Sequence, residues 1–264
     1  MCILFIAIKQ HPQYPLIVCA NRDEFYNRPT LPMHVWPNCD ILAGKDMQAS
    51  GTWFGVNSTG HISALTNLRM PERYSENKQT RGTLVLDALA PDRMSDQFIK
   101  QLSQEANQYN PFNLIFERND SLYYFNSVNK QAKQLQAGFH SICNGDIDDI
   151  WPKMAKGNQQ LEQTLRLDAQ VSETKLFEIL KNNEKAPEIC LPNTGVDLDV
   201  ESELSSIFVQ MPQYGTRSST ILLRDKNGQS RIIERLFNEN GELCEERSFL
   251  LVDGQFMEQR PNQL

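Results

Sequence analysis

A cysteine stands second in the chain, ahead of a run of aliphatic residues, in the opening stretch MCILFIAIKQ. Initiator methionine is usually removed when the next side chain is small, and its removal leaves Cys2 with both a thiol and a free α-amine. A thiolate is the nucleophile of cysteine chemistry, and an α-amine, whose ordinary pKa is about 7.7 to 8.0, can carry the proton. Cys2 is therefore a candidate nucleophile, with a buried structural cysteine as the alternative.

A polar cluster, NRDE at residues 21–24, ends the second apolar run of the chain. The apolar runs at residues 2–8 and 15–21 predict two β-strands joined by the turn segment KQHPQY. In such a hairpin the end of the second strand returns beside the start of the first. The cluster is therefore expected near Cys2, where a guanidinium would lower the pKa of a thiol. A solvated Arg–Glu pair at a strand end is the alternative.

The rest of the chain predicts strand pairs and helices without regular βαβ alternation. Two strands are expected around the turn NSTG, within residues 51–67, and two more within residues 112–127. Helical spacing predicts a helix that Pro91 ends and a second one from Ser95 to about Ala106.

The second half continues in the same manner. A strand is expected near residues 138–144, and helices are expected around Trp151 and Lys175. Residues 186–204 are predicted to be a long surface loop. Strands joined by Asn-Gly turns at Asn227 and Asn240 end the chain. The pattern favours an α+β fold of antiparallel sheets with helices layered outside them, as a single domain over residues 1–264.

Composition excludes several classes of protein. A net charge of −7 without a basic stripe argues against a nucleic-acid partner. No stretch approaches the roughly 20 apolar residues of a transmembrane segment, and the apolar start is too short for a secretory signal. The six cysteines include no CxxC pair and the four histidines show no metal-ligand spacing, so no metal site is expected. The low density of cysteines also predicts a reducing, cytoplasmic compartment.

Several blocks of the sequence resemble a known family. The MC start followed by NRDE, together with TWFGVNSTG, TRGTLVLDAL and NGDIDDIWPK, is similar to the NRDE family, also called transport and Golgi organisation two. That family in turn resembles the N-terminal-nucleophile (Ntn) hydrolases of the penicillin V acylase and bile-salt hydrolase branch. The resemblance implies a four-layer αββα sandwich and a cysteine nucleophile exposed by removal of Met1.

Carried over position by position, the hydrolase pattern implies six catalytic residues: Cys2, Arg22, Asp23, Asn67, Asn144 and Arg217. Asn67 and Asn144 take the places of side-chain amides that stabilise an oxyanion, and Asp23 would orient the α-amine. The acylases separate the Arg from the Asp, whereas here the two are neighbours, and adjacent strand residues point to opposite faces unless a bulge intervenes. Asn21 and Asp23 are therefore expected to face Cys2 while Arg22 and Glu24 face away, with Arg217 then supplying the positive charge.

Four residues flanking this site are candidate substrate-binding residues: Asn21, Phe25, Trp53 and Phe54. The three aromatic rings either line an apolar pocket or serve structural packing, and the sequence leaves both open.

Two functions remain open. The first is a cysteine Ntn hydrolase, an amidohydrolase that cleaves a linear C–N bond of a small apolar-acyl substrate and needs no cofactor. The second, implied by the NRDE family, is a non-enzymatic protein that carries haem or an acyl lipid on the same fold, with haem as a transported ligand.

Overall fold

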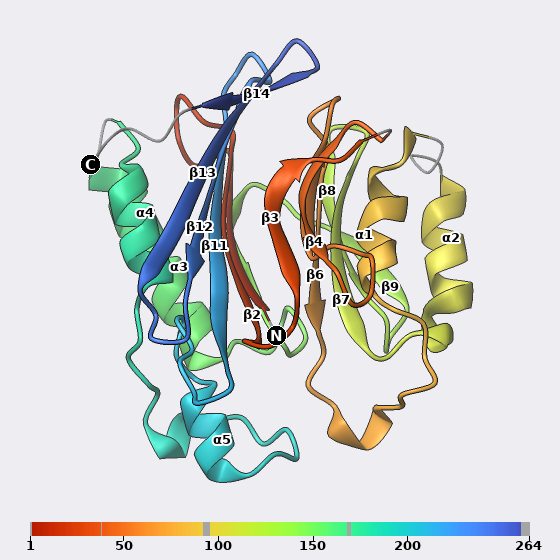
Figure 1. Ribbon diagram of the computed structural model, residues 1–264, viewed down its shortest axis with the longest axis vertical. Helices are drawn as coiled ribbons and strands as arrows, with labels where there is room; N and C mark the ends of the chain where they lie inside the picture. Colours follow the sequence, from red (N-terminus) through yellow and green to blue (C-terminus); the bar gives the residue numbers. More distant parts are fainter. Residues whose placement is uncertain (1, 38, 92–95, 168–169, 260–264) are drawn as a thin grey trace. The chain divides into compact units, whose positions relative to one another are not determined.

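The computed structural model describes residues 2–37, 39–91, 96–167 and 170–259. The chain divides into two compact units, the first formed by residues 1–27 and 136–264 and the second by residues 28–135. Each unit holds one seven-stranded antiparallel sheet (Figure 1). Whether the two units form the single domain that the sequence analysis predicts stays a prediction.

The sheet of the first unit contains both chain segments that the sequence analysis places around Cys2. Its strand order is β10 (Gly138–Ile142), β1 (Cys2–Ile8), β2 (Leu16–Phe25), β11 (Tyr214–Arg224), β12 (Ser230–Phe237), β13 (Leu243–Val252) and β14 (Gln255–Gln259). Helix α3 (Pro152–Leu167) contacts β10 and β1, and helix α4 (Glu173–Leu180) contacts β2 and β11. The connection from α4 to β11 contains the 3-10 helix η4 (Glu188–Cys190) and helix α5 (Leu198–Glu203).

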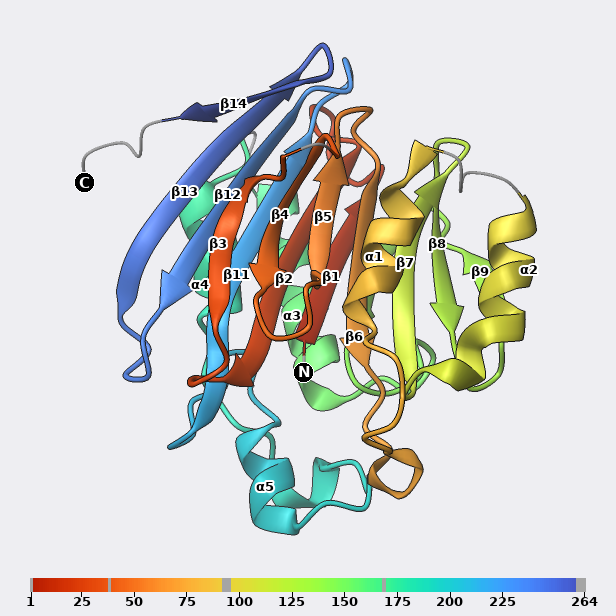
Figure 2. The ribbon, with the colours of Figure 1, turned by 45° about the vertical axis from the view of Figure 1, so that its right-hand side comes forward.

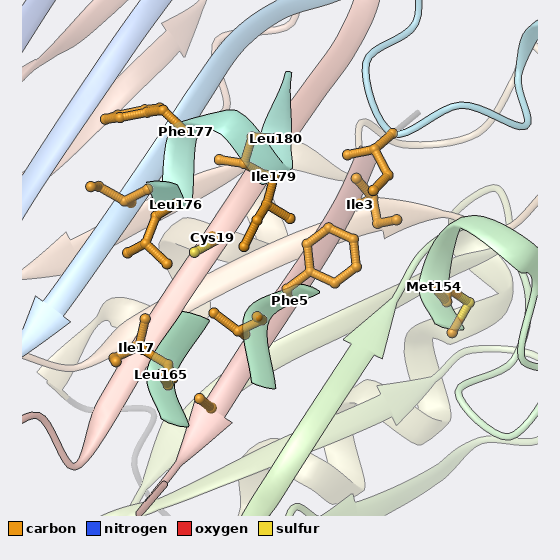
Figure 3. Packing of buried hydrophobic residues seen from close by; sticks show 14 of the residues in the cluster. Ile3, Phe5, Ile17, Cys19, Met154, Leu165, Leu176, Phe177, Ile179 and Leu180 are labelled. Atoms are coloured by element: carbon orange, nitrogen blue, oxygen red, sulfur yellow. The ribbon is translucent and has the colours of Figure 1, made fainter. Parts of the chain in front are cut away.

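One face of this sheet packs against α3 and α4, and we call it the helix-covered face. Strand alternation gives it the odd-numbered residues of β1 and β2, such as Phe5 and Cys19, which share a core with Met154 of α3 and Leu176 of α4 (Figure 3). The even-numbered residues, such as Leu4, belong to the opposite face, and Leu4 is also buried. Both faces are apolar over most of these strands, as the continuous apolar runs predict.

The second unit repeats the arrangement of one sheet and one helical layer. Its strand order is β3 (Thr30–Val35), β4 (Ile41–Asp46), β5 (Phe54–Asn57), β6 (Ile62–Asn67), β7 (Phe112–Arg118), β8 (Ser121–Asn126) and β9 (Gln131–Gln134). Helix α1 (Gly82–Leu89) lies along β5, β6 and β7 (Figure 2). Helix α2 (Asp96–Glu105) and the 3-10 helices η1 (Pro71–Arg73) and η3 (Ala106–Gln108) complete the unit.

Most predicted elements are confirmed, including the hairpins β1–β2, β5–β6 and β7–β8 and the meander β11–β13. Strands β3, β4, β9 and β14 were not predicted, because β3 contains Pro32, β4 contains Gly44, and β9 and β14 are short, exposed edge strands. The predicted loop at residues 186–204 contains α5. Ser95, the expected start of the second helix, lies outside the described residues, as does Met1.

The two sheets, each with helices on one face, form the α+β fold that the sequence predicts. Within the described ranges, no helix is both long enough and apolar enough to cross a membrane.

Candidate functional site

One transverse row of residues crosses the end of the first unit's sheet. Cys2 pairs with Arg22 between β1 and β2, and Arg22 pairs with Ser218 between β2 and β11. On the other side of β1, the ladder with β10 ends where Leu4 pairs with Ile142, and Asn144 lies two residues beyond the end of β10. Residues directly opposite in antiparallel strands share a face. Positions 2, 22 and 218, which we call the Cys2 row, therefore lie side by side on the sheet face opposite the helix-covered one.

This register reverses the orientation expected for the NRDE cluster. The β1–β2 ladder runs without a shift from Cys2 opposite Arg22 to Ile8 opposite Leu16, so Arg22 shares the face of position 2. Asn21 and Asp23 then belong to the helix-covered face, and the expectation that they face Cys2 was wrong. Which residues of β2 share the face of position 2 depends on which residue pairs with Cys2 across the hairpin. The sequence does not reveal this register.

Asn21 is occupied by structural hydrogen bonds. Its Nδ2 donates to the carbonyl oxygens of Leu180 at 2.8 Å and of Ile207 at 2.9 Å, and its Oδ1 accepts a hydrogen bond of 2.6 Å from Ser219 Oγ. These contacts fasten β2 to the end of α4 and to β11 on the helix-covered face. The geometry favours a structural role over the substrate-binding role expected for Asn21.

Asp23 is buried at the same end of β2. Its Oδ1 accepts a hydrogen bond of 2.7 Å from Thr216 Oγ1, and the Thr216 hydroxyl in turn accepts one of 2.9 Å from the Val209 amide. Tyr214 Oη donates to the Asp23 carbonyl oxygen at 3.0 Å. A terminal amine lies at the end of a strand rather than on one of its faces, so the role of Asp23 in orienting the amine of Cys2 stays a prediction.

Arg217 occupies a β-bulge beside the Cys2 row. The register between β2 and β11 shifts between Thr216 and Ser218, which makes Arg217 the extra residue. Bulges re-aim side chains and often occur next to active sites. Nη1 of Arg217 donates to the Phe25 carbonyl oxygen at 2.8 Å. The bulge lies on β11 and not within the NRDE cluster.

Charge gathers around this bulge. Burial lowers the pKa of Arg217, the positive charge of Arg22 lowers it further, and Glu24 opposes both effects. Arg22 is 5% exposed, and its Nη2 lies 4.0 Å from Glu24 Oε2. Two guanidinium groups therefore act on one another at the end of the sheet where Cys2 lies.

The remaining predicted site residues lie elsewhere. Phe25, in the first unit, is 49% exposed and packs edge-on against Tyr214, with 5.2 Å between ring centroids. Asn67 ends β6 in the second unit, opposite Phe112.

Phe54 and Trp53 also belong to the second unit. Phe54 is buried in β5, opposite Ala64. The Trp53 indole packs over Gly44, where a Cβ atom would lie 2.4 Å from the ring. Both rings therefore pack within their own unit. Their predicted role in lining a substrate pocket stays a prediction.

Ser218 is the residue of this row that sequence reasoning missed. It is 3% exposed, opposite Arg22, and follows Arg217 directly in the stretch GTRSST. A serine-rich strand gives no sign of which hydroxyl is buried, so only the register singles this one out.

The other described thiols differ from a reactive cysteine. Burial raises the pKa of the Cys19 thiol to about 12, and Cys143 is equally buried. Three further cysteines, Cys39, Cys190 and Cys244, are exposed. Among the residues that the structure describes, no group of three or more His, Cys, Asp or Glu side chains could hold a metal ion.

The model of the family described as Transport and Golgi organisation 2 matches residues 1–239. The chain belongs to this family. The Transport and Golgi organization 2 homolog of Mus musculus is 34% identical over 256 residues, which cover 89% of this chain and 92% of that protein. The Transport and Golgi organization protein 2 of Drosophila melanogaster is 26% identical over 263 residues, covering 89% and 91%.

A solved structure extends the comparison of this Transport and Golgi organisation 2 family member to its fold. The C2A mutant of the conjugated bile acid hydrolase from Clostridium perfringens matches with a TM-score of 0.55 and 10% sequence identity, covering 100% of this chain and 98% of that one. At this identity the likeness shows the fold alone. It confirms the predicted Ntn-hydrolase-like α+β fold.

Proposed function

We propose that the protein is a cysteine amidohydrolase that cleaves a linear C–N bond of a small substrate with an apolar acyl group. The observation that supports this is the Cys2 row, in which Arg22 lies directly across the ladder from Cys2, while Asn144 follows β10, the strand on the other side of β1. A cation beside a cysteine favours the thiolate, and an amide side chain beside it can stabilise an oxyanion.

The proposed reaction begins with removal of Met1, which frees the α-amine of Cys2. The Cys2 thiolate attacks the carbonyl carbon of the amide, and Asn144 donates a hydrogen bond to the oxyanion, a contribution of roughly 3 to 4 kcal/mol. The C–N bond breaks as the α-amine passes its proton to the leaving amine, which leaves a thioester on Cys2. Water then hydrolyses the thioester, releasing the carboxylic acid and restoring the thiol.

The comparison with the bile acid hydrolase supports the same chemistry. That structure is of a hydrolase in which a cysteine at position 2 has been replaced by alanine. A cysteine occupies position 2 here as well. The relatives are instead named for transport and Golgi organization, and transport agrees with the second candidate, a carrier; haem or an acyl lipid as its cargo is implied by the resemblance to the NRDE family alone.

The test combines intact mass with a covalent probe. In a C39S/C190S/C244S background, which removes the exposed thiols, the purified protein is expected to lack Met1 and to gain one acyl group from a thiol-directed acyl probe. The additional change Cys2→Ala is expected to abolish both the adduct and the turnover of any amide that the background protein cleaves.

Two results would contradict the hydrolase. One is a mass that retains Met1 in most molecules. The other is a broad amide screen without hydrolysis, together with saturable binding of haem or an acyl lipid that survives Cys2→Ala; this combination supports the carrier.

A further inference from the structure

A buried hydroxyl without a hydrogen-bond partner lies in the Cys2 row. Ser218 is 3% exposed, and across the described part of the chain its Oγ has no hydrogen-bond partner. Leaving such a group unpaired costs about 1 to 3 kcal/mol, and buried polar groups are nearly always paired. An unpaired hydroxyl at this place therefore indicates a ligand.

The position of Ser218 fixes how far such a ligand reaches. Neighbouring strands lie about 4.8 Å apart, so the backbone of Ser218, two strands from Cys2, is about 10 Å from it, with Arg22 between them. The next residues on the same face are Ala20 and Thr220, which are paired with one another. Both have small side chains and are buried beside Arg22.

The chemistry of the two side chains selects one kind of group. A guanidinium has only donors, and a serine hydroxyl can donate as well, so a group that contacts both must be an acceptor. A carboxylate accepts several hydrogen bonds and is attracted by the charge of Arg22. We propose that Ser218 and Arg22 form a subsite for a carboxylate on the acyl chain of the substrate, about 5 to 10 Å from the scissile carbonyl. This inference rests on the proposed hydrolase function and names its substrate class, linear amides of dicarboxylic acids.

The chain supplies a matched control for Ser218. Ser248 in β13 is also 3% exposed and its Oγ also has no hydrogen-bond partner among the described residues. It pairs with Ile233 on the helix-covered face, away from the Cys2 row. Because S218A and S248A each remove a buried, unpaired hydroxyl, both are expected to fold and to keep or raise the melting temperature.

The experiment compares two coumarin amides that differ in one carboxylate. For wild type, S218A and S248A, kcat/KM is measured with two substrates. They are the 7-amino-4-methylcoumarin amide of octanoic acid and the 7-amino-4-methylcoumarin mono-amide of octanedioic acid. Wild type and S248A are expected to prefer the carboxylated amide about tenfold, and S218A to lose most of this preference through a higher KM. No preference in wild type, or an unchanged preference in S218A, overturns the subsite.

A binding measurement separates this inference from the proposed function. Calorimetric titration with octanedioate needs no turnover, and Kd is expected to rise about tenfold in S218A and to stay unchanged in S248A. If wild type cleaves neither amide, the titration still judges the subsite, and the broad amide screen described above judges the hydrolase. Equal Kd values in the two variants overturn the subsite.

Discussion

The surroundings of two charged residues, one in each unit, have opposite effects on the charged form of the side chain. At the end of the first sheet the pKa of Arg217 is lowered by burial and by the positive charge of Arg22. Such clustering weakens the fold, and groups whose pKa is shifted in this way concentrate at functional sites. Asp46 in the second unit is the contrasting case, because its partners stabilise its charge.

Asp46 is expected to support the second unit only while it is ionised. Burial raises the pKa of its carboxyl, but hydrogen bonds from Arg28 at 2.7 and 2.9 Å and from the amides of Gln48 and Ala49 outweigh burial, so the pKa is lowered. A lowered folded-state pKa stabilises the fold above the unfolded pKa near 3.9 and loses that contribution as pH falls through the folded value.

We expect D46N to lower the free energy of unfolding by about 2 kcal/mol at pH 7, and the difference from wild type to shrink below about pH 4. Urea unfolding of both proteins across this range measures it. The control E162Q, which removes one side of the exposed pair between Glu162 and Arg166, is expected to change stability by less than about 0.5 kcal/mol. A difference for D46N that stays constant down to pH 3 would contradict the assigned role.

At the scale of elements, helix α3 sets the position of β1, the strand that begins with Cys2. Gly157 of α3 lies over Phe5, and a Cβ at Gly157 would be 2.1 Å from the ring. Phe5 is fully buried, so neither partner can move aside without repacking the core. The close approach of this helix to the sheet therefore depends on the missing side chain.

G157A is expected to destabilise the protein by about 1 to 3 kcal/mol, although alanine is the better helix former, because it overpacks the contact with Phe5. A155G, on the exposed side of the same helix, is the control and is expected to cost about 1 kcal/mol through helix propensity alone. Thermal and urea unfolding measure both. A G157A variant that is more stable than wild type would contradict the close contact between Gly157 of α3 and the Phe5 ring of β1.

Elements with strong local signals could be predicted, and the site geometry could not. Alternating or continuous apolar runs and Asn-Gly turns identify β1, β2 and the final meander. The bulge at Arg217 has no residue-type signature at its own position, because the glycine of this strand, Gly215, lies two residues before the extra residue. Without that bulge and the β1–β2 register, the sequence could not tell which of Arg22 and Asp23 shares the face of Cys2.

At the scale of the molecule, the Cys2 row is assembled by the path of the chain. After β2 the chain leaves the first unit, forms residues 28–135 as the second unit, and returns at β10 beside β1. Asn144, two residues beyond β10, comes back to this sheet only through this return, which no local pattern encodes. The resemblance to Ntn hydrolases, and not the physics of the sequence, singled out Asn144 in advance.

Two buried asparagines of the first unit allow a test that separates a catalytic role from a structural one. Asn144 is 2% exposed just beyond the end of β10, the neighbour of β1, and Asn21 is 1% exposed on the helix-covered face. We expect N144A to lower kcat about 100-fold, the effect of losing one oxyanion donor. N21A is expected to lower the free energy of unfolding by about 2 kcal/mol, because the Leu180 and Ile207 carbonyls lose their donor, with kcat per folded molecule unchanged.

N67A extends this comparison to the second unit, where the resemblance alone assigns the second oxyanion donor. A loss of kcat similar to that of N144A would support the assignment, and the double variant would then lose less than the product of the two single effects, because residues that stabilise one oxyanion act together. If N67A leaves kcat unchanged while N144A lowers it, oxyanion stabilisation belongs to the first unit. If N21A lowers kcat as much as N144A does, the division of the β1–β2 hairpin into a catalytic and a structural face is wrong.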